Sequence, residues 1–430
     1  MPTETIHALA TAPGRAGIAV VRVSGPKSPR ILEVMTGRPL PDNRQLFVRK
    51  LISAAGEVLD QALVLSFPNG HSFTGEDVVE FHLHGSRAVV SAVLREIDKT
   101  GLSRPATAGE FTRRALQNDR LDLLQVQGLG QLIDAETELQ RKTAVRLFDG
   151  DLGDMVRAWR RDLVEAASLI EATLDFADED VPEDVTPFVK ERLDRVRTEL
   201  EKQLLGVAAA RRIQDGFLVV IFGAPNSGKS SLINILTRSD AAIVSDIPGT
   251  TRDIIEVRME MEGLLVRLVD TAGLRETVDP IERVGVDRAK NRIEAADFRL
   301  LVLDSTSPSS LKLDEENGPD LVVRTKSDLS GSFGISAVTG EGIGDLVRMI
   351  GVALAERVQD TGLVSAVRDE RVLREAAHEL QVASGHLRGG QPELMSESLR
   401  AAMAHLSEMI GDVDIEDILD HIFRSFCIGK

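Results

Sequence analysis

The chain has 430 residues, of which 43% are hydrophobic and 28% charged, and this length predicts about two to four domains rather than one core. The 51 Lys and Arg against 68 Asp and Glu give a net charge of −17, so binding of nucleic acid would require a local basic patch. The single cysteine, Cys427, excludes an intramolecular disulfide framework. With no opening signal segment and no apolar run of about 18 residues, we expect a cytoplasmic protein.

Residues 1–117 have mixed α/β character, with strands expected at residues 16–25, 61–68 and 77–85. The third strand alternates apolar and polar side chains with the period of a half-buried strand, in the order Val79, Glu80, Phe81, His82, Leu83 and His84. One face therefore presents a carboxylate and two imidazoles. An ordinary solvated sheet face and a functional site both fit this pattern, whereas a metal site is not favoured because no cysteine or second carboxylate accompanies it.

From about Asn118 the pattern becomes helical. Apolar residues recur on one helix face at Leu193, Val196, Leu200 and Leu204, and helical patterns return beyond residue 360. We interpret the two helical blocks as one discontinuous domain into which an α/β domain is inserted. The expected fold is therefore an N-terminal α/β domain, a discontinuous helical domain and a Ras-like P-loop domain. The expected bounds are 1–117 for the N-terminal domain, 118–215 for the first helical part, 216–360 for the inserted domain and 361–430 for the second helical part.

The strongest motif is a P-loop. An apolar run at residues 217–222 predicts a buried strand, and it leads into Gly-Ala-Pro-Asn-Ser-Gly-Lys-Ser at residues 223–230 and then into a helix. Its glycines let backbone N–H groups surround phosphate oxygens, and the helix N-terminus adds partial positive charge. We expect Lys229 to reach the β- and γ-phosphates and the Ser230 hydroxyl to ligate Mg²⁺.

Two further motifs complete the phosphate side of the predicted site. Asp270, at the start of an Asp-x-x-Gly motif, is placed to hold Mg²⁺ through water, and the Gly273 N–H is placed to meet the γ-phosphate. Thr251, in the loop of residues 245–253, is placed to ligate Mg²⁺ when a triphosphate is bound; such loops order around the γ-phosphate and act as switches. Two more buried strands of the same sheet are expected at residues 299–304 and 320–324.

The motif Thr-Lys-Ser-Asp at residues 325–328 selects the base. The Asp328 carboxylate can accept both the N1–H and the 2-amino group of guanine, which adenine lacks, so we predict GTP rather than ATP. Ser336 and Ala337 would support the base from the following loop. Most GTPases carry Asn where this chain has Thr325, and that Asn braces both the P-loop and the base edge. The substitution therefore predicts weaker nucleotide affinity.

Hydrolysis requires a positioned water. Leu274 follows the Asp-x-x-Gly motif, where Ras-like proteins place a water-orienting Gln. Glu282 is a downstream carboxylate, although its spacing alone fits an ordinary acid on a helix face. The candidate GTP-binding residues are Asn226, Ser227, Gly228, Lys229, Ser230, Ser231, Ser245, Asp246, Ile247, Pro248, Gly249, Thr250, Thr251, Asp270, Thr271, Ala272, Gly273, Thr325, Lys326, Ser327, Asp328, Ser336, Ala337 and Val338.

Seven motifs spread over the chain carry a family resemblance. They lie at residues 11–17, 73–77, 109–115, 118–123, 225–231, 246–253 and, as Cys-Ile-Gly-Lys, 427–430. With these motifs the chain closely resembles the tRNA modification GTPases called MnmE or TrmE over essentially its whole length.

The resemblance implies a homodimer, formed through an N-terminal domain that binds a formyl-tetrahydrofolate, and G domains that meet across the dimer when GTP and K⁺ bind. It implies that Glu282 positions the water and that K⁺ occupies the place of an arginine finger. It further implies that an FAD-dependent partner, MnmG (GidA), joins in adding an aminomethyl or carboxymethylaminomethyl group to the wobble uridine of certain tRNAs. The positions that match the family's folate contacts are Arg22, Glu80, Arg120 (Lys in the family) and Lys430, and those that match its K⁺ ligands are Asn226, Ser245, Ile247 and Thr250.

Three matters stay open at this stage. Cys427 is either a small buried apolar residue or a reactive thiol. Four arginines are either a local basic patch for tRNA or ordinary solvated charges, namely Arg104, Arg113, Arg114 and Arg120. The alternative function is that of a ribosome-assembly or signalling GTPase, similar to Era-like and Der-like proteins. The central G domain and the Cys-x-Gly-Lys end favour the tRNA-modifying function.

Overall fold

The structure, a computed structural model, describes residues 4–39, 46–175, 185–239, 241–243, 256–270, 292–307, 318–331, 334–358, 362–411 and 429. The chain divides into two compact units. One consists of residues 1–130 and 407–430, and the other of residues 131–406.

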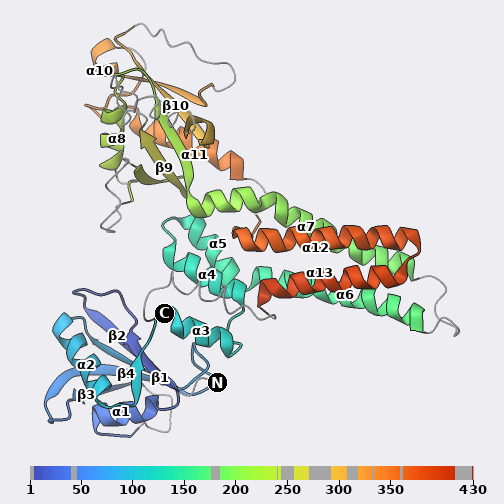
Figure 1. Ribbon diagram of the computed structural model, residues 1–430. Coiled ribbons are helices and arrows are strands. Elements are labelled where there is room, and N and C mark those ends of the chain that lie inside the picture. The colour runs from blue at the N-terminus through green and yellow to red at the C-terminus, as the bar shows by residue number, and fades with distance from the viewer. Residues whose placement is uncertain are drawn as a thin grey trace, which may run out of the picture. The chain divides into compact units, whose positions relative to one another are not determined.

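The first unit is built on a six-stranded sheet in the order β3-β4-β5-β2-β1-β6 (Figure 1). Its strands are β1 (Thr5–Leu9), β2 (Ile18–Ser24), β3 (Phe47–Ile52), β4 (Val58–Phe67), β5 (Val78–His84) and β6 (Ser103–Pro105). Neighbouring strands are antiparallel except β1 and β6, which are parallel. The three strands expected from the sequence are confirmed as β2, β4 and β5, whereas β1, β3 and β6 were not expected.

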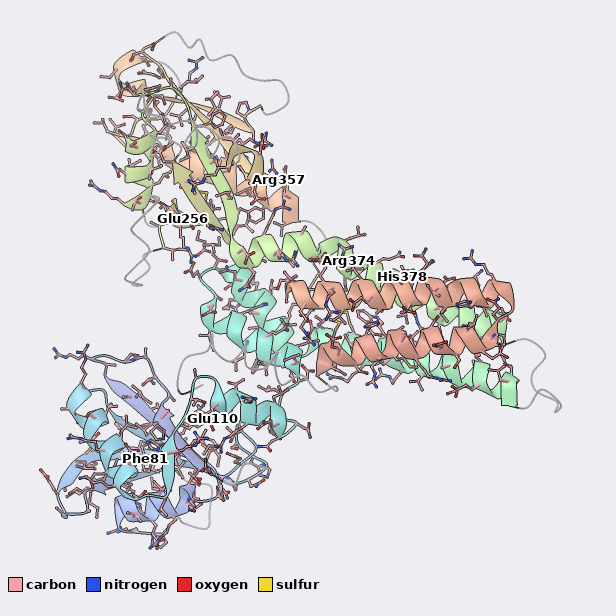
Figure 2. All side chains as sticks on the ribbon, viewed as in Figure 1. Phe81, Glu110, Glu256, Arg357, Arg374 and His378 are labelled. Atoms are coloured by element: carbon pink, nitrogen blue, oxygen red, sulfur yellow. The ribbon has the colours of Figure 1, made fainter. Side chains whose placement is uncertain are left out.

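Helices cover both faces of this sheet. They are α1 (Ser28–Thr36), α2 (Arg87–Lys99) and α3 (Glu110–Gln117). On one face, α1 and α2 pack over the buried side chains of β5, including Phe81 (Figure 2), which confirms the predicted alternation. On the other face, Phe111 of α3 packs with Ile6 and Ala8 of β1. Because Ala8 is opposite Arg22 in the β1–β2 register, Arg22 points to this second face.

The second unit combines helices with a second sheet. Its helices outside the sheet region are α5 (Glu138–Phe148), α6 (Asp151–Asp175), α7 (Thr186–Asp215), α12 (Val367–Gly389) and α13 (Pro392–Ile410), and α4 (Leu123–Asp134) leads into them. Figure 1 shows α12 beside α7 and α13 beside α6. Arg211 of α7 bonds the Ser365 carbonyl and the Glu370 carboxylate, at 2.9 and 2.6 Å. Helices that precede and follow the sheet region therefore pack on each other.

The second sheet has five strands in the order β11-β10-β7-β9-β8. Its strands are β7 (Phe217–Phe222), β8 (Glu256–Met261), β9 (Leu264–Asp270), β10 (Phe298–Asp304) and β11 (Leu321–Thr325). Strands β7, β9, β10 and β11 are parallel, and β8 is antiparallel to β9. The accompanying helices are α8 (Lys229–Thr237), α10 (Ser327–Ser330), α11 (Ile343–Ala355) and the 3₁₀ helix η3 (Glu356–Val358). Strands β7, β10 and β11 match the apolar runs predicted from the sequence. The carboxyl ends of the four parallel strands share one edge, where ligands of such sheets bind.

No helix in the described ranges has both the length and the apolar character that a membrane crossing requires.

Candidate functional site

The P-loop follows β7 and is shaped by two glycines. A Cβ atom at Gly223 would lie 2.2 Å from the carbonyl oxygen of Val302, so only glycine fits there. Gly228 caps the N-terminus of α8 with φ +96, a left-handed conformation that glycine adopts without strain. The loop and the first turn of α8 therefore form the strand–loop–helix arrangement of an anion site, with backbone N–H groups at the helix N-terminus.

Lys229 crosses the inside of this loop. Its side chain is only 6% exposed, and its Nζ donates hydrogen bonds to the carbonyl oxygens of Gly223, at 2.9 Å, and Ala224, at 2.8 Å. Burial lowers the pKa of Lys229, and the nearby Asp270 carboxylate opposes that shift. A buried ammonium inside an anion-binding loop is the arrangement expected of a phosphate-binding lysine.

Ser230 and Asp270 meet across the phosphate side of the site. The Ser230 hydroxyl donates a hydrogen bond to the Asp270 Oδ2 at 3.2 Å, and Asp270 is the last residue of β9. The hydroxyl in the first turn of α8 and the carboxylate at the end of β9 are oxygen ligands of the hard type that Mg²⁺ prefers. These two residues therefore fit the Mg²⁺ role expected from the sequence.

The base-selecting motif lies at the end of β11 and beside the P-loop. Thr325 is 2% exposed, and its hydroxyl donates to the Ser227 carbonyl at 2.6 Å. Lys326, with φ +59, pairs with Asp304, and its hydrogen bond is the main cause that lowers the pKa of Asp304 to about 2. Asp328 is exposed in the first turn of α10.

The loop that would support the base is also ordered by local hydrogen bonds. Ser336 is buried, and its hydroxyl accepts hydrogen bonds from the backbone N–H groups of Val338, at 3.2 Å, and Thr339, at 3.1 Å.

Asn226, in the P-loop, is exposed and has φ +60. The predicted nucleotide residues that lie outside the described residues are Ser245, Asp246, Ile247, Pro248, Gly249, Thr250, Thr251, Thr271, Ala272, Gly273 and Glu282.

In the first unit, Arg22 and Glu80 form an ion pair across neighbouring strands. They are opposite each other in the β2–β5 register, and Arg22 Nε donates to Glu80 Oε1 at 2.8 Å. The guanidinium carbon lies 5.7 Å from the centroid of the Phe73 ring and 5.6 Å from that of Phe111, within the range of cation–π attraction. His82 Nε2 lies 3.4 Å from the other Glu80 oxygen.

Phe73 and Phe111 were not predicted as site residues, although both lie in motifs that carry the family resemblance. The polar alternation of β5 placed His84 in one group with Glu80 and His82. In the structure His84 instead lies 2.7 Å from Asp60, so the polar face of β5 divides into two clusters.

Arg120 lines a separate cavity of about 920 Å³ beside the loop at Gly75, with Asn69, Asp77 and Asp119 also in its wall. The described lining residues include neither Arg22 nor Glu80. Among its described lining residues, this cavity therefore does not bring Arg120 together with Arg22 and Glu80. Lys430 and Cys427 lie outside the described residues.

The idea of an exposed arginine patch is wrong for Arg114, which is buried, whereas Arg104 is exposed but paired with carboxylates. Arg114 is 2% exposed and donates to Glu76, at 3.0 Å, and to Glu110, at 3.0 Å. Arg104 forms a two-bond pair with Glu110 (labelled in Figure 2). Burial alone would raise the pKa of Glu110, but hydrogen bonds from Arg104, the Thr107 N–H and Arg114 lower it to about 2. Arg114 is therefore a buried partner of carboxylates, and Arg104 is a paired arginine at the surface.

Comparisons with known proteins agree with this organisation. The model of the GTP-binding protein TrmE N-terminus matches residues 5–120, and the MnmE helical domain model matches residues 123–427. The chain is 48% identical to the tRNA modification GTPase MnmE of Dinoroseobacter shibae and 50% identical to that of a Ruegeria species, in each case over 99% of this chain and 100% of the relative. The chain belongs to the MnmE family.

The solved structures that match this chain are less similar to it in sequence than the MnmE relatives are. The G domain of the T. maritima FeoB iron transporter is 26% identical, with a TM-score of 0.24 over 32% of this chain and 98% of that one. A GTP-binding protein of Sulfolobus solfataricus in complex with GDP is 21% identical, with a TM-score of 0.26 over 47% of this chain and 68% of that one. The MnmE assignment rests on the full-length relatives and the family models.

Proposed function

We propose that this chain binds and hydrolyses GTP at its P-loop and uses the hydrolysis in tRNA modification. The observation that carries the proposal is the meeting of Lys229, Ser230, Asp270 and Thr325 where the parallel strands end. The full-length relatives are named tRNA modification GTPases, and this favours the tRNA-modifying function over a ribosome-assembly or signalling GTPase.

Each residue has a distinct part in the proposed reaction. The Lys229 ammonium binds the β- and γ-phosphate oxygens. Ser230 and Thr251 would ligate Mg²⁺, and Asp270 would hold it through water. When bound, Mg²⁺ neutralises charge that develops on the phosphoryl oxygens. Asp328 binds guanine. Because Leu274 cannot orient a water, that part falls to Glu282.

We further propose that K⁺ supplies the charge that an arginine finger supplies in other GTPases. The exposed amide of Asn226 offers an oxygen at the edge of the P-loop, and the other ligands of this proposal are Ser245, Ile247 and Thr250. Binding of K⁺ would then couple hydrolysis to the meeting of two G domains in a homodimer.

The first unit is proposed to bind a formyl-tetrahydrofolate through Arg22, Glu80, Arg120 and Lys430. A folate offers carboxylates to cationic side chains and pterin N–H donors to a carboxylate. The paired Arg22 and Glu80, with two aromatic rings beside them, fit both kinds of group. The proposed setting is the cytoplasm, with the FAD-dependent MnmG protein as partner and the wobble uridine of tRNA as the modified base.

A base switch tests the nucleotide site. Xanthine carries a carbonyl where guanine has the 2-amino group, so Asp328→Asn should lose GTP hydrolysis and gain XTP hydrolysis. Asp345→Asn, which changes an exposed acid on α11, is the matched control and should behave as the wild type. Hydrolysis of ATP as fast as GTP, or an Asp328→Asn variant that still prefers GTP, would contradict the proposal.

A further inference from the structure

Thr325 stands where most GTPases carry Asn, and the structure shows which groups its side chain contacts. The residue ends β11, and its hydroxyl oxygen lies 2.6 Å from the Ser227 carbonyl of the P-loop and 3.2 Å from the Leu303 carbonyl of β10. It also packs against Gly228, since a Cβ atom there would lie 3.1 Å from the Thr325 Oγ1. Thr325 therefore joins the base-selecting motif to the P-loop.

The number of donor hydrogens on the side chain at position 325 decides how many acceptors it can bond. A threonine hydroxyl carries one hydrogen, whereas an asparagine amide carries two. The nearer carbonyl, that of Ser227, takes the single Thr325 hydrogen. Guanine presents acceptors at N7 and O6, as well as the donors that Asp328 can bind. An asparagine at this position would have a second N–H to offer to the base, and Thr325 does not.

We propose that Thr325 keeps the P-loop braced through Ser227 but gives no hydrogen bond to the guanine N7, so that base selection falls to Asp328. This inference rests on the proposed GTP function and specifies how the same site reads the base. Two consequences follow. The brace stabilises the loop that holds the phosphates, so it matters equally for every base. The N7 atom contributes nothing to affinity in the natural chain.

The experiment compares GDP with 7-deaza-GDP, which has a C–H group in place of N7, by calorimetric titration of the full chain. The wild type should bind the two nucleotides within about twofold of each other. Thr325→Asn should prefer GDP by about tenfold, because its amide adds a bond to N7 worth about 1.4 kcal/mol. A preference of the wild type for GDP of tenfold or more would overturn the inference.

Two further variants test the brace. Thr325→Val keeps the shape but leaves the Ser227 carbonyl without its donor, so both nucleotides should bind about tenfold more weakly. Thr325→Ser keeps the hydroxyl and should remain within about threefold of the wild type. Unchanged GDP affinity in Thr325→Val would show that the Thr325–Ser227 hydrogen bond does not support nucleotide binding. If Thr325→Val does not fold, the wild type and Thr325→Asn still decide the N7 question.

Failure of the proposed function has a different signature. In that case the wild type binds neither guanine nucleotide, or it binds ADP as tightly as GDP, and the inference falls with the function. A guanine-specific wild type that distinguishes GDP from 7-deaza-GDP would instead preserve the function and refute only the role of Thr325.

Discussion

Gly429 packs directly against the end of strand β1: a Cβ atom added to it would lie 2.1 Å from the carbonyl oxygen of Leu9. Its φ of +102 is also one that residues with a side chain rarely adopt. The penultimate residue and the first strand therefore meet within the first unit, and only glycine permits that approach. The contact places Gly429 beside β1. Strand β1 pairs with β2, which carries Arg22.

Gly429→Ala should displace the C-terminal residues and weaken the binding of a formyl-tetrahydrofolate at least about tenfold, or about 1.4 kcal/mol. Deletion of residues 427–430 should do the same and abolish tRNA modification, while GTP hydrolysis persists because its residues lie in the other unit. Titration beside a GTPase assay measures both. Gly385→Ala, on a helix with open space around the added Cβ, is the control and should change neither. Unchanged folate affinity in the deletion variant would show that residues 427–430 do not take part in folate binding.

GTP hydrolysis should depend on K⁺, because the proposed site uses a monovalent cation instead of an arginine finger. Replacing K⁺ by Na⁺ at constant ionic strength should slow turnover at least about tenfold, a loss of about 1.4 kcal/mol of transition-state stabilisation. The measurement is steady-state phosphate release in the two salts. Equal rates would show that no K⁺ ion takes part.

Glu282→Ala should lower turnover about a hundredfold while GTP affinity stays near that of the wild type, since the acid is proposed to touch water rather than nucleotide. Single-turnover hydrolysis and equilibrium binding separate the two effects. Glu356→Ala, which removes an exposed acid from η3, should leave both unchanged. A large loss of GTP affinity at unchanged turnover would assign Glu282 to binding instead.

The first unit should lose stability in mild acid through His7. The ring is 2% exposed, with Nδ1 at 3.0 Å from the Ser103 hydroxyl and Nε2 at 3.2 Å from the Asp98 carboxylate. Burial lowers the pKa of His7 below 6.5, and Asp98 only partly offsets this shift. Because the unfolded chain takes up the proton more readily, the stabilisation is complete above pH 6.5 and is lost as the pH falls through the folded pKa.

Hydrogen exchange of β1 at pH 5.5 and 7.5 measures this effect, since the single tryptophan, Trp159, belongs to the other unit. Protection of β1 should fall at the lower pH, and His7→Gln should reduce that difference. The control is His378→Gln on α12, whose side chain is exposed (Figure 2). Equal protection of wild-type β1 at the two pH values would contradict the expected shift.

Local patterns predicted the strands and motifs that depend on neighbouring residues. The alternation of Val79, Phe81 and Leu83 identified β5, and the P-loop was found because its glycines, lysine and helix are contiguous. Strand β8 was missed because its exposed polar residues, such as Glu256, occupy the edge of the sheet and weaken the apolar signal (Figure 2).

Features that depend on distant residues could not be predicted. The burial of Arg114 depends on Glu76, which lies 38 residues away in sequence. The brace from Thr325 to Ser227 joins residues 98 apart, and no periodicity records that contact. The sequence predicted weaker nucleotide affinity from Thr325, and it could not show that the Thr325 hydroxyl contacts the P-loop carbonyl of Ser227.

Nucleoside mass spectrometry of tRNA from a deletion strain tests the central claim, a GTPase that acts in tRNA modification, most directly. The strain should lack the aminomethyl or carboxymethylaminomethyl group on wobble uridine, a plasmid with the wild-type gene should restore it, and one with Lys229→Ala should not. Wobble nucleosides that are unchanged in the deletion strain, or full restoration by Lys229→Ala, would contradict the account.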